Sequence, residues 1–128
     1  MNIQIISNDT QVIDSLIKGE NKISFPIITY KGSANSLDII DFIFSGNPLL
    51  LVLDDDFTKP NTVKILKSIR NIKDTLKVVF LTSDNSLTLG KEISGLAIQY
   101  YGIKPLAHDE LFLTINALLK NRISNITN

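Results

Sequence analysis

The residues that decide the fold are LLLVLDDD, at positions 49–56. Five consecutive aliphatic residues are typical of a strand that is buried on both faces, the environment of a central strand in a parallel sheet. Three carboxylates follow without a spacer, and burying a lone carboxylate is energetically costly. We therefore expect the acids at the carboxyl end of the strand, where open α/β sheets bind ligands and carry out chemistry.

The same triplet has a simpler interpretation as an acidic turn. Aspartate is common in turns and as the N-cap of a helix, so the three acids are also what a strand end followed by a helix start requires. The triplet alone leaves both interpretations open: a reactive or ion-binding carboxylate, and a turn without chemistry.

The composition is that of one ordinary soluble domain. The 128 residues include 44% hydrophobic and 20% charged residues, enough to bury a single core. Lysine plus arginine and aspartate plus glutamate each number 13, so no net charge favours nucleic acid or an anionic membrane. Cysteine is absent, which excludes disulfides, thiolate metal sites and cysteine nucleophiles. Neither a membrane span nor a signal-peptide pattern is found, so we expect a cytoplasmic protein.

Five strand-like segments alternate with five helical ones. Short β-rich or aliphatic runs predict strands at 2–7, 25–30, 49–53, 77–82 and 98–103. Apolar residues at helical spacing predict helices that include 12–17, 37–44, 63–72, 85–96 and 109–122, with a loop at 58–61. The helix over 85–96 is the weakest because Gly90 and Gly95 lower helix propensity. Alternation of this kind predicts an α/β fold with a parallel sheet covered on both faces.

The most common five-strand solution is the flavodoxin-like (βα)5 arrangement with strand order 2-1-3-4-5. That order places residues 7–9 beside the acid triplet. It also brings Thr82, at the end of the fourth strand, and Lys104, after the fifth, to the same edge of the sheet. Four strand ends are thus expected to converge on one shallow site.

In these residues the chain resembles the receiver domains of two-component response regulators, of the chemotaxis type. The resemblance extends over residues 2–122 and implies a receiver-like domain at 1–123, followed by a polar tail or linker start at 124–128. It also implies a phosphoryl group transferred from a histidine kinase to a strand-three aspartate, with Mg²⁺ held by nearby acids. A cation is needed because phosphorylating a carboxylate brings negative charges together.

The family's functional positions map onto this chain as follows. Pro48 and the aliphatic run 49–53 place the phosphoacceptor at Asp54. A rival register places it at Asp56, because the family usually has proline four residues later and Pro60 fits. The phosphoryl-contacting residues are Thr82 and Lys104, and the Lys104–Pro105 bond is cis in the family. The conformational switch is Tyr101, and the metal ligands are Asp54, Asp56 and, more weakly, Asp9.

Strand one departs from the family. The acid pair that should hold Mg²⁺ is replaced by Ser7 and Asn8, which offer only neutral oxygens to a hard ion. Three functions are therefore weighed: a receiver phosphorylated on Asp54, a phosphorylation-independent pseudo-receiver, and a small flavodoxin-like enzyme or nucleotide binder. The last lacks a glycine-rich phosphate loop and a nucleophile–base pair. We expect a signalling protein rather than an enzyme.

The expected partners follow from the resemblance. They are a histidine kinase or phosphotransfer protein and an output domain or partner protein, with no direct nucleic acid or membrane contact. The contact surface is the face formed by the fourth helix, fifth strand and last helix, and a homodimer through that face is an alternative.

Simpler roles compete with several of these assignments. Lys104 is also compatible with a solvated charge, Thr82 with a strand-forming residue and Tyr101 with a packing aromatic. The single histidine, His108, is expected to be a cap or solvated, and Lys64, Lys67 and Arg70 to form a solvated helix face.

Overall fold

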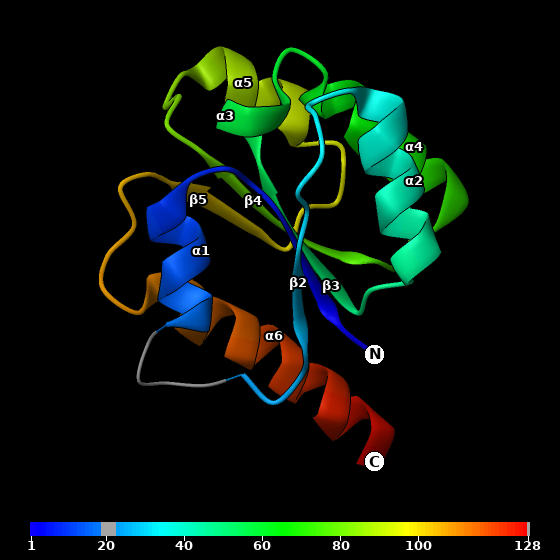
Figure 1. Cartoon of the computed structure of the whole chain (residues 1–128), viewed down its shortest axis with the longest axis vertical. Helices are drawn as coiled ribbons and strands as arrows, with labels where there is room; N and C mark the ends of the chain where they lie inside the picture. The colour runs from blue at the N-terminus through cyan, green and yellow to red at the C-terminus, as the bar shows by residue number, and fades with distance from the viewer. Residues whose placement is uncertain (19–22, 128) are drawn as a thin grey trace.

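The structure, a computed structural model, describes residues 1–18 and 23–127, with side chains as far as Lys120. Within this part of the chain, strands and helices alternate, except that two helices follow the third strand (Figure 1). The strands are β1 (Ile3–Ile6), β2 (Ile27–Thr29), β3 (Leu50–Asp54), β4 (Lys77–Thr82) and β5 (Tyr100–Ile103). The helices are α1 (Thr10–Ile17), α2 (Ser36–Gly46), α3 (Asp55–Thr58), α4 (Thr62–Ile72), α5 (Leu87–Ile93) and α6 (Glu110–Thr127).

The five strands form one parallel sheet in the order β2-β1-β3-β4-β5, which confirms the predicted flavodoxin-like topology. The aliphatic run before the acids is β3, at the centre of the sheet, and every residue of this strand is buried. The predicted 49–53 strand and the observed one differ by a single residue at each end. Asp54 is the last residue of β3, so the acid triplet lies at the carboxyl edge of the sheet.

Two helical layers cover the sheet, and alternate strand residues face each of them. On β3, Leu50 and Val52 pack with α1 and α6, whereas Leu51 and Leu53 pack with α2, α4 and α5. These two buried clusters are the core of the domain. Strand alternation continues to the carboxyl edge, where it decides on which side of the sheet each polar side chain emerges.

Three predictions about elements need correction. The predicted loop at 58–61 begins later than expected, because residues 55–58 form the short helix α3, so the described residues contain six helices rather than five. A single helical turn is too short to show apolar periodicity. The helix predicted over 85–96 is confined to Leu87–Ile93, and Gly90 lies in its middle. The strand predicted over 25–30 is reduced to three residues on the sheet edge.

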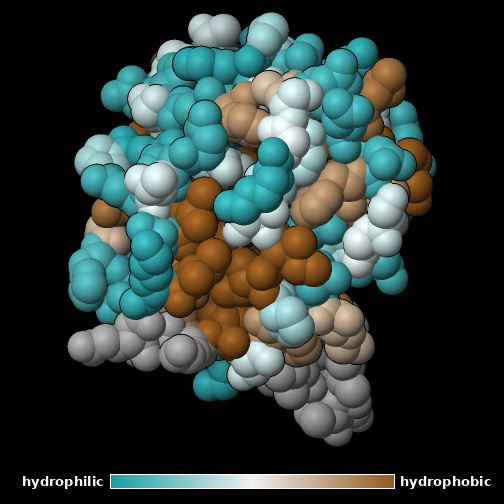
Figure 2. All heavy atoms as spheres, in the orientation of Figure 1, coloured by the Kyte–Doolittle hydropathy of each residue, from teal (hydrophilic) through white to brown (hydrophobic). Residues whose placement is uncertain are grey.

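A contiguous apolar patch lies where α1, β2 and α6 meet (Figure 2). A shallow groove within it has a volume of about 280 Å³ and is lined by Leu16, Ile17, Ile23, Phe25 and Ile27. Among the helices of the described residues, none is long and apolar enough to cross a bilayer.

Candidate functional site

The three consecutive acids point to different sides of the sheet. Asp54 continues the alternation of Leu50 and Val52, which face α1 and α6. Asp55 follows the strand and turns toward the opposite layer, where it meets Thr82 of β4. Thr82 has the same parity as Val78 and Phe80, which face α2, α4 and α5. The carboxyl edge therefore carries two adjacent polar clusters, one on each side of the sheet.

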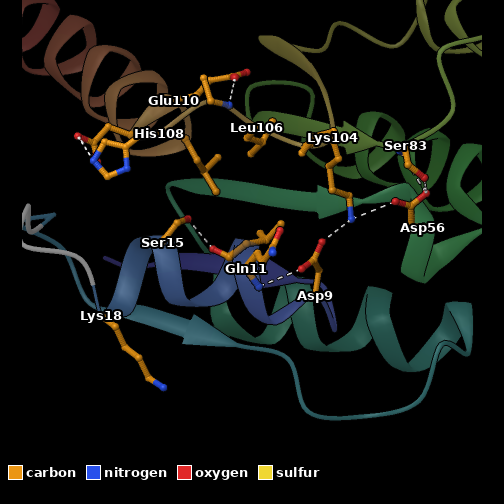
Figure 3. Close-up of a pocket in the computed structure, with 15 residues that line it drawn as sticks. Asp9, Gln11, Ser15, Lys18, Asp56, Ser83, Lys104, Leu106, His108 and Glu110 are labelled. Atoms are coloured by element: carbon orange, nitrogen blue, oxygen red, sulfur yellow. Dashed lines mark hydrogen bonds and ion pairs between the residues drawn. The ribbon is translucent and has the colours of Figure 1, made fainter.

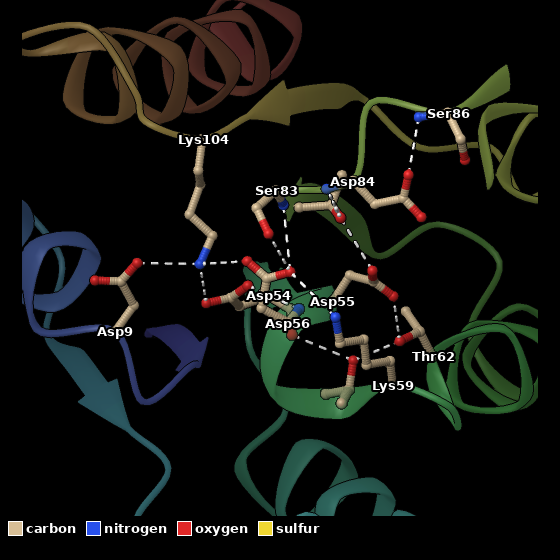
Figure 4. Close-up of polar contacts among 12 residues, drawn as sticks. Asp9, Asp54, Asp55, Asp56, Lys59, Thr62, Ser83, Asp84, Ser86 and Lys104 are labelled. Atoms are coloured by element: carbon tan, nitrogen blue, oxygen red, sulfur yellow. Dashed lines mark hydrogen bonds and ion pairs between the residues drawn. The ribbon is translucent and has the colours of Figure 1, made fainter.

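The first is the lysine cluster, in which one ammonium group holds three carboxylates (Figure 4). Lys104 Nζ lies 2.8 Å from an oxygen of Asp54 and 3.0 Å from oxygens of both Asp9 and Asp56. Asp54 is fully buried, and only 12% of the Lys104 side chain is exposed. Lys104 follows β5 and precedes a cis peptide bond to Pro105, as the family resemblance implies. The lysine cluster consists of Asp9, Asp54, Asp56 and Lys104.

Asp54 both caps a helix and pairs with a cation. One of its oxygens accepts the N–H of Asp56 at 3.1 Å, which makes it the N-cap of α3. The other accepts the Lys104 ammonium and the Ser7 hydroxyl. Asp9 is likewise both the N-cap of α1 and a partner of Lys104. Capping and ion pairing are therefore combined in the same side chains.

The electrostatics of the lysine cluster follow from these contacts. Burial disfavours the charged form of Lys104, but hydrogen bonds to Asp54, Asp56 and Asp9 outweigh it and raise the pKa of Lys104 well above its usual range. Burial raises the pKa of Asp9, and the hydrogen bonds from Lys104 and from the Gln11 N–H outweigh it, so the net pKa is lowered. The pKa of Asp56 is lowered in the same way, against burial, by hydrogen bonds from Lys104 and Ser83. All three groups are charged at neutral pH.

Ser7 and Asn8 occupy the strand-one positions where the resemblance implies an acid pair. Ser7 is buried, and its hydroxyl donates to Asp54 at 2.6 Å while accepting the N–H of Asp9. Asn8 is exposed. The Ser7 hydroxyl proton is thus already committed to the Asp54 carboxylate, and the Asn8 amide faces solvent.

The residues at this edge do not fit a Mg²⁺ site in the arrangement observed. A hard dication needs several carboxylate or carbonyl oxygens that converge on one point. Here the convergence point of Asp9, Asp54 and Asp56 is the Lys104 ammonium. Among the described side chains, no group of three or more His, Cys, Asp or Glu residues is arranged to hold a metal.

The second cluster, the threonine cluster, surrounds Asp55 with hydroxyl groups. Asp55 is 4% exposed, and its two oxygens accept the hydroxyls of Thr62 at 2.7 Å and Thr82 at 3.0 Å. The Thr62 oxygen is in turn 2.7 Å from that of Thr58. Among the described side chains, no ion pair involves Asp55. The threonine cluster consists of Asp55, Thr58, Thr62 and Thr82.

Asp56 is the most open of the three acids. Its side chain is 24% exposed, contacts Lys104, and accepts hydrogen bonds from the Ser83 hydroxyl at 2.8 Å and the Ser83 N–H at 3.3 Å. The exposed Lys59 ammonium lies 4.0 Å from an oxygen of Asp56. Asp56 therefore connects α3 to the segment that follows β4.

A groove opens beside the lysine cluster between α1 and the segment that joins β5 to α6 (Figure 3). Its volume is about 800 Å³. Asp9, Asp56 and Lys104 line one end, and residues 105–111 line much of the remainder. The lysine cluster is accordingly accessible from this side, through Lys104 rather than through the buried Asp54.

The remaining predicted residues lie outside both clusters. The Tyr101 ring is half-buried and packs on Phe80, with ring centroids 4.8 Å apart. The His108 side chain is 96% exposed and lies near Asp109 at the groove rim. Arg70 is not part of a solvated helix face, which corrects that prediction: its guanidinium donates to the carbonyls of Asp74, Leu76, Leu96 and Ala97.

Sequence reasoning missed the roles of Asp55, Thr62 and Ser83. The sequence presents Asp55 and its neighbours as one acidic edge, but strand alternation separates Asp55 from Asp54. The signal that identifies it is parity, because Thr82 and the residue after β3 emerge on the same side. Thr62 carried no signal, since it is the first residue of a helix that begins after an irregular turn.

No protein-family model matches the chain. Over 125 residues it is 32% identical to the transcriptional regulatory protein BasR of Escherichia coli, covering 94% of this chain and 53% of BasR. It is 27% identical over 122 residues to the response regulator MprA of Mycobacterium avium, covering 94% of this chain and 51% of MprA. The chain thus spans about half the length of the curated relatives it matches.

Solved structures share the fold. A CheY-like response regulator receiver domain protein from Methanospirillum hungatei superposes with a TM-score of 0.72 at 17% identity, covering 97% of both chains. A two-component response regulator from Clostridium difficile gives a TM-score of 0.73 at 24% identity, covering 94% of this chain and 96% of that one. The homologues of this chain are therefore response regulators, and its structural neighbours are CheY-like receiver domains whose fold it shares.

Proposed function

We propose that this chain is a receiver module that signals through protein contacts and does not depend on phosphorylation of Asp54. The observation that carries the proposal is the lysine cluster: Lys104 is the shared ion-pair partner of three carboxylates, and the strand-one positions hold Ser7 and Asn8. Such a module binds its partner in one constant state, as the pseudo-receiver interpretation of the sequence expects.

The physical argument concerns charge. Phosphorylation of Asp54 converts its single negative charge into as many as two, beside Asp9 and Asp56, and phosphoryl transfer requires cations that offset this charge. Among the described side chains, the cation within 3.0 Å of the Asp54 carboxylate is Lys104, and its ammonium is shared with Asp9 and Asp56. Because the residues present do not fit Mg²⁺, the charge introduced by phosphorylation has no sufficient counter-charge here.

The proposed contact surface is the α5–β5–α6 face. It exposes three large apolar side chains, Leu87 on α5, Ile103 on β5 and Leu113 on α6, which are 81%, 45% and 60% exposed. We propose an output domain or a partner protein of the signalling pathway as the occupant, in the cytoplasm, with a second copy of the chain as the alternative. Neither nucleic acid nor membrane is a direct partner in this proposal, and the role is signalling rather than catalysis.

A second function is favoured by a specific observation, the Asp54–Lys104 pair at the ends of β3 and β5. In a phosphorylated receiver, a carboxylate oxygen of Asp54 attacks the phosphorus of a phosphohistidine on a kinase or phosphotransfer protein. The phosphorus–nitrogen bond breaks, and its electron pair returns to the imidazole nitrogen. Lys104 and Thr82 then contact the phosphoryl oxygens, Tyr101 is the switch, and Asp56 is the rival acceptor.

Intact-mass measurement separates the two functions. The full chain is incubated with a small phosphodonor, with and without Mg²⁺, beside Asp54→Asn and Asp56→Asn. The proposal predicts no phosphoryl adduct in any sample. A Mg²⁺-dependent adduct that is lost only in Asp54→Asn contradicts the proposal and establishes the phosphoacceptor; loss only in Asp56→Asn supports the rival register.

A variant designed to gain Mg²⁺ binding tests why no phosphoryl adduct is expected. Ser7→Asp combined with Asn8→Asp restores the acid pair that the family resemblance implies. We expect saturable Mg²⁺ binding by calorimetry in this double variant and none in the natural chain. The added carboxylates are further ligands for Mg²⁺, with which the ion can compete against Lys104. Equal binding by both proteins contradicts the argument that Ser7 and Asn8 limit the metal site.

A further inference from the structure

A buried acid without a cation is the feature of this site that the proposed function does not use. Asp55 is 4% exposed, and among the described side chains no ion pair involves it. Burying an unpaired carboxylate is costly unless hydrogen bonds compensate. Here the compensation comes from two hydroxyl groups that lie on different elements, Thr62 at the start of α4 and Thr82 at the end of β4. A side chain that joins α3, α4 and β4 in this way is suited to positioning.

A hydroxyl group has only one proton to donate, so the donors can be assigned. The Thr82 proton is directed to Asp55, and its oxygen accepts the N–H of Asp84 at 3.0 Å. Ser7 has the same arrangement on the other side of the sheet, with its proton on Asp54 and its oxygen accepting the N–H of Asp9. The two hydroxyls are therefore divided between the two acids, and Thr82 has no proton left for Asp54.

We propose that Asp55 is a positioning residue that holds the Thr82 hydroxyl on the α2/α4/α5 side of the sheet, away from Asp54. By holding Thr82 it also orders the segment between β4 and α5, because the Asp84 N–H binds the same hydroxyl. Ser83 in that segment is held separately by Asp56. The inference deepens the proposed function by naming the contact that keeps the start of α5, and with it one border of the proposed contact face, in a single arrangement.

Solution NMR on the full chain tests this directly. Three-bond scalar couplings to the Thr82 methyl carbon report its χ1 rotamer, and amide exchange reports the Asp84 N–H. In the natural chain we expect one Thr82 rotamer. Asp55→Leu removes the hydrogen-bond acceptor and fills its place with an apolar side chain. In this variant we expect rotamer-averaged Thr82 couplings and about fivefold faster exchange of the Asp84 N–H, the effect of one lost hydrogen bond.

Two variants make the result specific. Asp55→Asn retains a polar group that can donate to the Thr82 oxygen, so we expect the single rotamer to be kept. Asp54→Asn removes the neighbouring acid of the lysine cluster, and we expect the Thr82 couplings to stay unchanged. A purely structural role for Asp55 does not predict this difference between leucine and asparagine.

Several outcomes overturn the inference. Unchanged Thr82 couplings in folded Asp55→Leu do so, as does an equal change in Asp54→Asn. If Asp55→Leu does not fold, the natural chain alone decides, because averaged Thr82 couplings there contradict a held hydroxyl. These outcomes are distinct from failure of the proposed function, which is recorded as a phosphoryl adduct by mass measurement.

Discussion

The lysine and threonine clusters lie side by side at one sheet edge, yet they stabilise buried acids by different means. Asp54 is fully buried and is paired with a lysine ammonium at 2.8 Å, whereas Asp55 is 4% exposed and is held by two hydroxyls. Consecutive residues reach such different surroundings because a strand sends neighbours to opposite faces. An acidic triplet is therefore not one site, and each carboxylate has to be assigned its own partner.

The largest effect is expected from removing the shared cation. Lys104→Met leaves the buried Asp54 without its counter-charge, and we expect the free energy of unfolding at pH 7 to fall by about 3–5 kcal/mol. Chemical denaturation measures it. Lys59→Met is the matched control. Lys59 is 61% exposed and its ammonium comes no closer than 4.0 Å to Asp56, so we expect the free energy of unfolding to fall by less than about 0.5 kcal/mol. Similar losses in both variants contradict the special role of Lys104.

We expect the difference in the free energy of unfolding between the natural chain and Lys104→Met to become smaller at acid pH. The pKa values of Asp9 and Asp56 are lowered from 3.8 in the folded protein, so the unfolded chain binds more protons as the pH falls through this range. The stabilisation is present above pH 4 and is lost as the pH drops through the folded pKa values. Unfolding free energies measured from pH 7 to pH 3 check this, and a gap that widens toward acid contradicts it.

Neutralising each buried acid compares the clusters directly. Asp54→Asn removes the carboxylate that pairs with the Lys104 ammonium, for which we expect a loss of about 2 kcal/mol. Asp55→Asn breaks no ion pair among the described side chains and keeps an amide oxygen that can accept a hydroxyl proton, so a loss of about 1 kcal/mol or less is expected. Thermal and chemical denaturation give both values. A larger loss in Asp55→Asn than in Asp54→Asn reverses the comparison.

The smallest effect is expected at the open acid. Ser83→Ala removes the hydroxyl hydrogen bond to Asp56 at an exposed position, and a loss of about 0.5 kcal/mol is expected. Thr62→Val, which removes a buried donor to Asp55, is the internal comparison, and we expect it to be the more destabilising of the two.

Much of this arrangement was accessible from sequence. The aliphatic run 49–53 identified the central strand, and alternation of elements gave the sheet order that the structure confirms. That order correctly brought Asp54, Asp9 and Lys104 together, because the carboxyl ends of parallel strands meet at one edge.

The parts that were missed depend on tertiary contacts without a local signal. A single turn such as α3 has no apolar periodicity, so the pattern predicts neither this helix nor the place of Thr62 after it. The resemblance implies that Thr82 contacts a phosphoryl group on Asp54, and no local signal predicts the hydrogen bond that Thr82 donates to Asp55 in the structure. Arg70 lay on an apparently solvated face, and only the approach of residues 96–97 to residues 74–76 provides the carbonyls that it binds.

The coupling of Lys104 to each acid tests the division into two clusters most directly. Double-mutant cycles combine Lys104→Met with Asp54→Asn in one set and with Asp55→Asn in the other, and unfolding free energies are measured at pH 7. We predict a coupling energy of about 2 kcal/mol or more for Lys104 with Asp54 and less than about 0.5 kcal/mol for Lys104 with Asp55. Equal coupling to both acids contradicts the division.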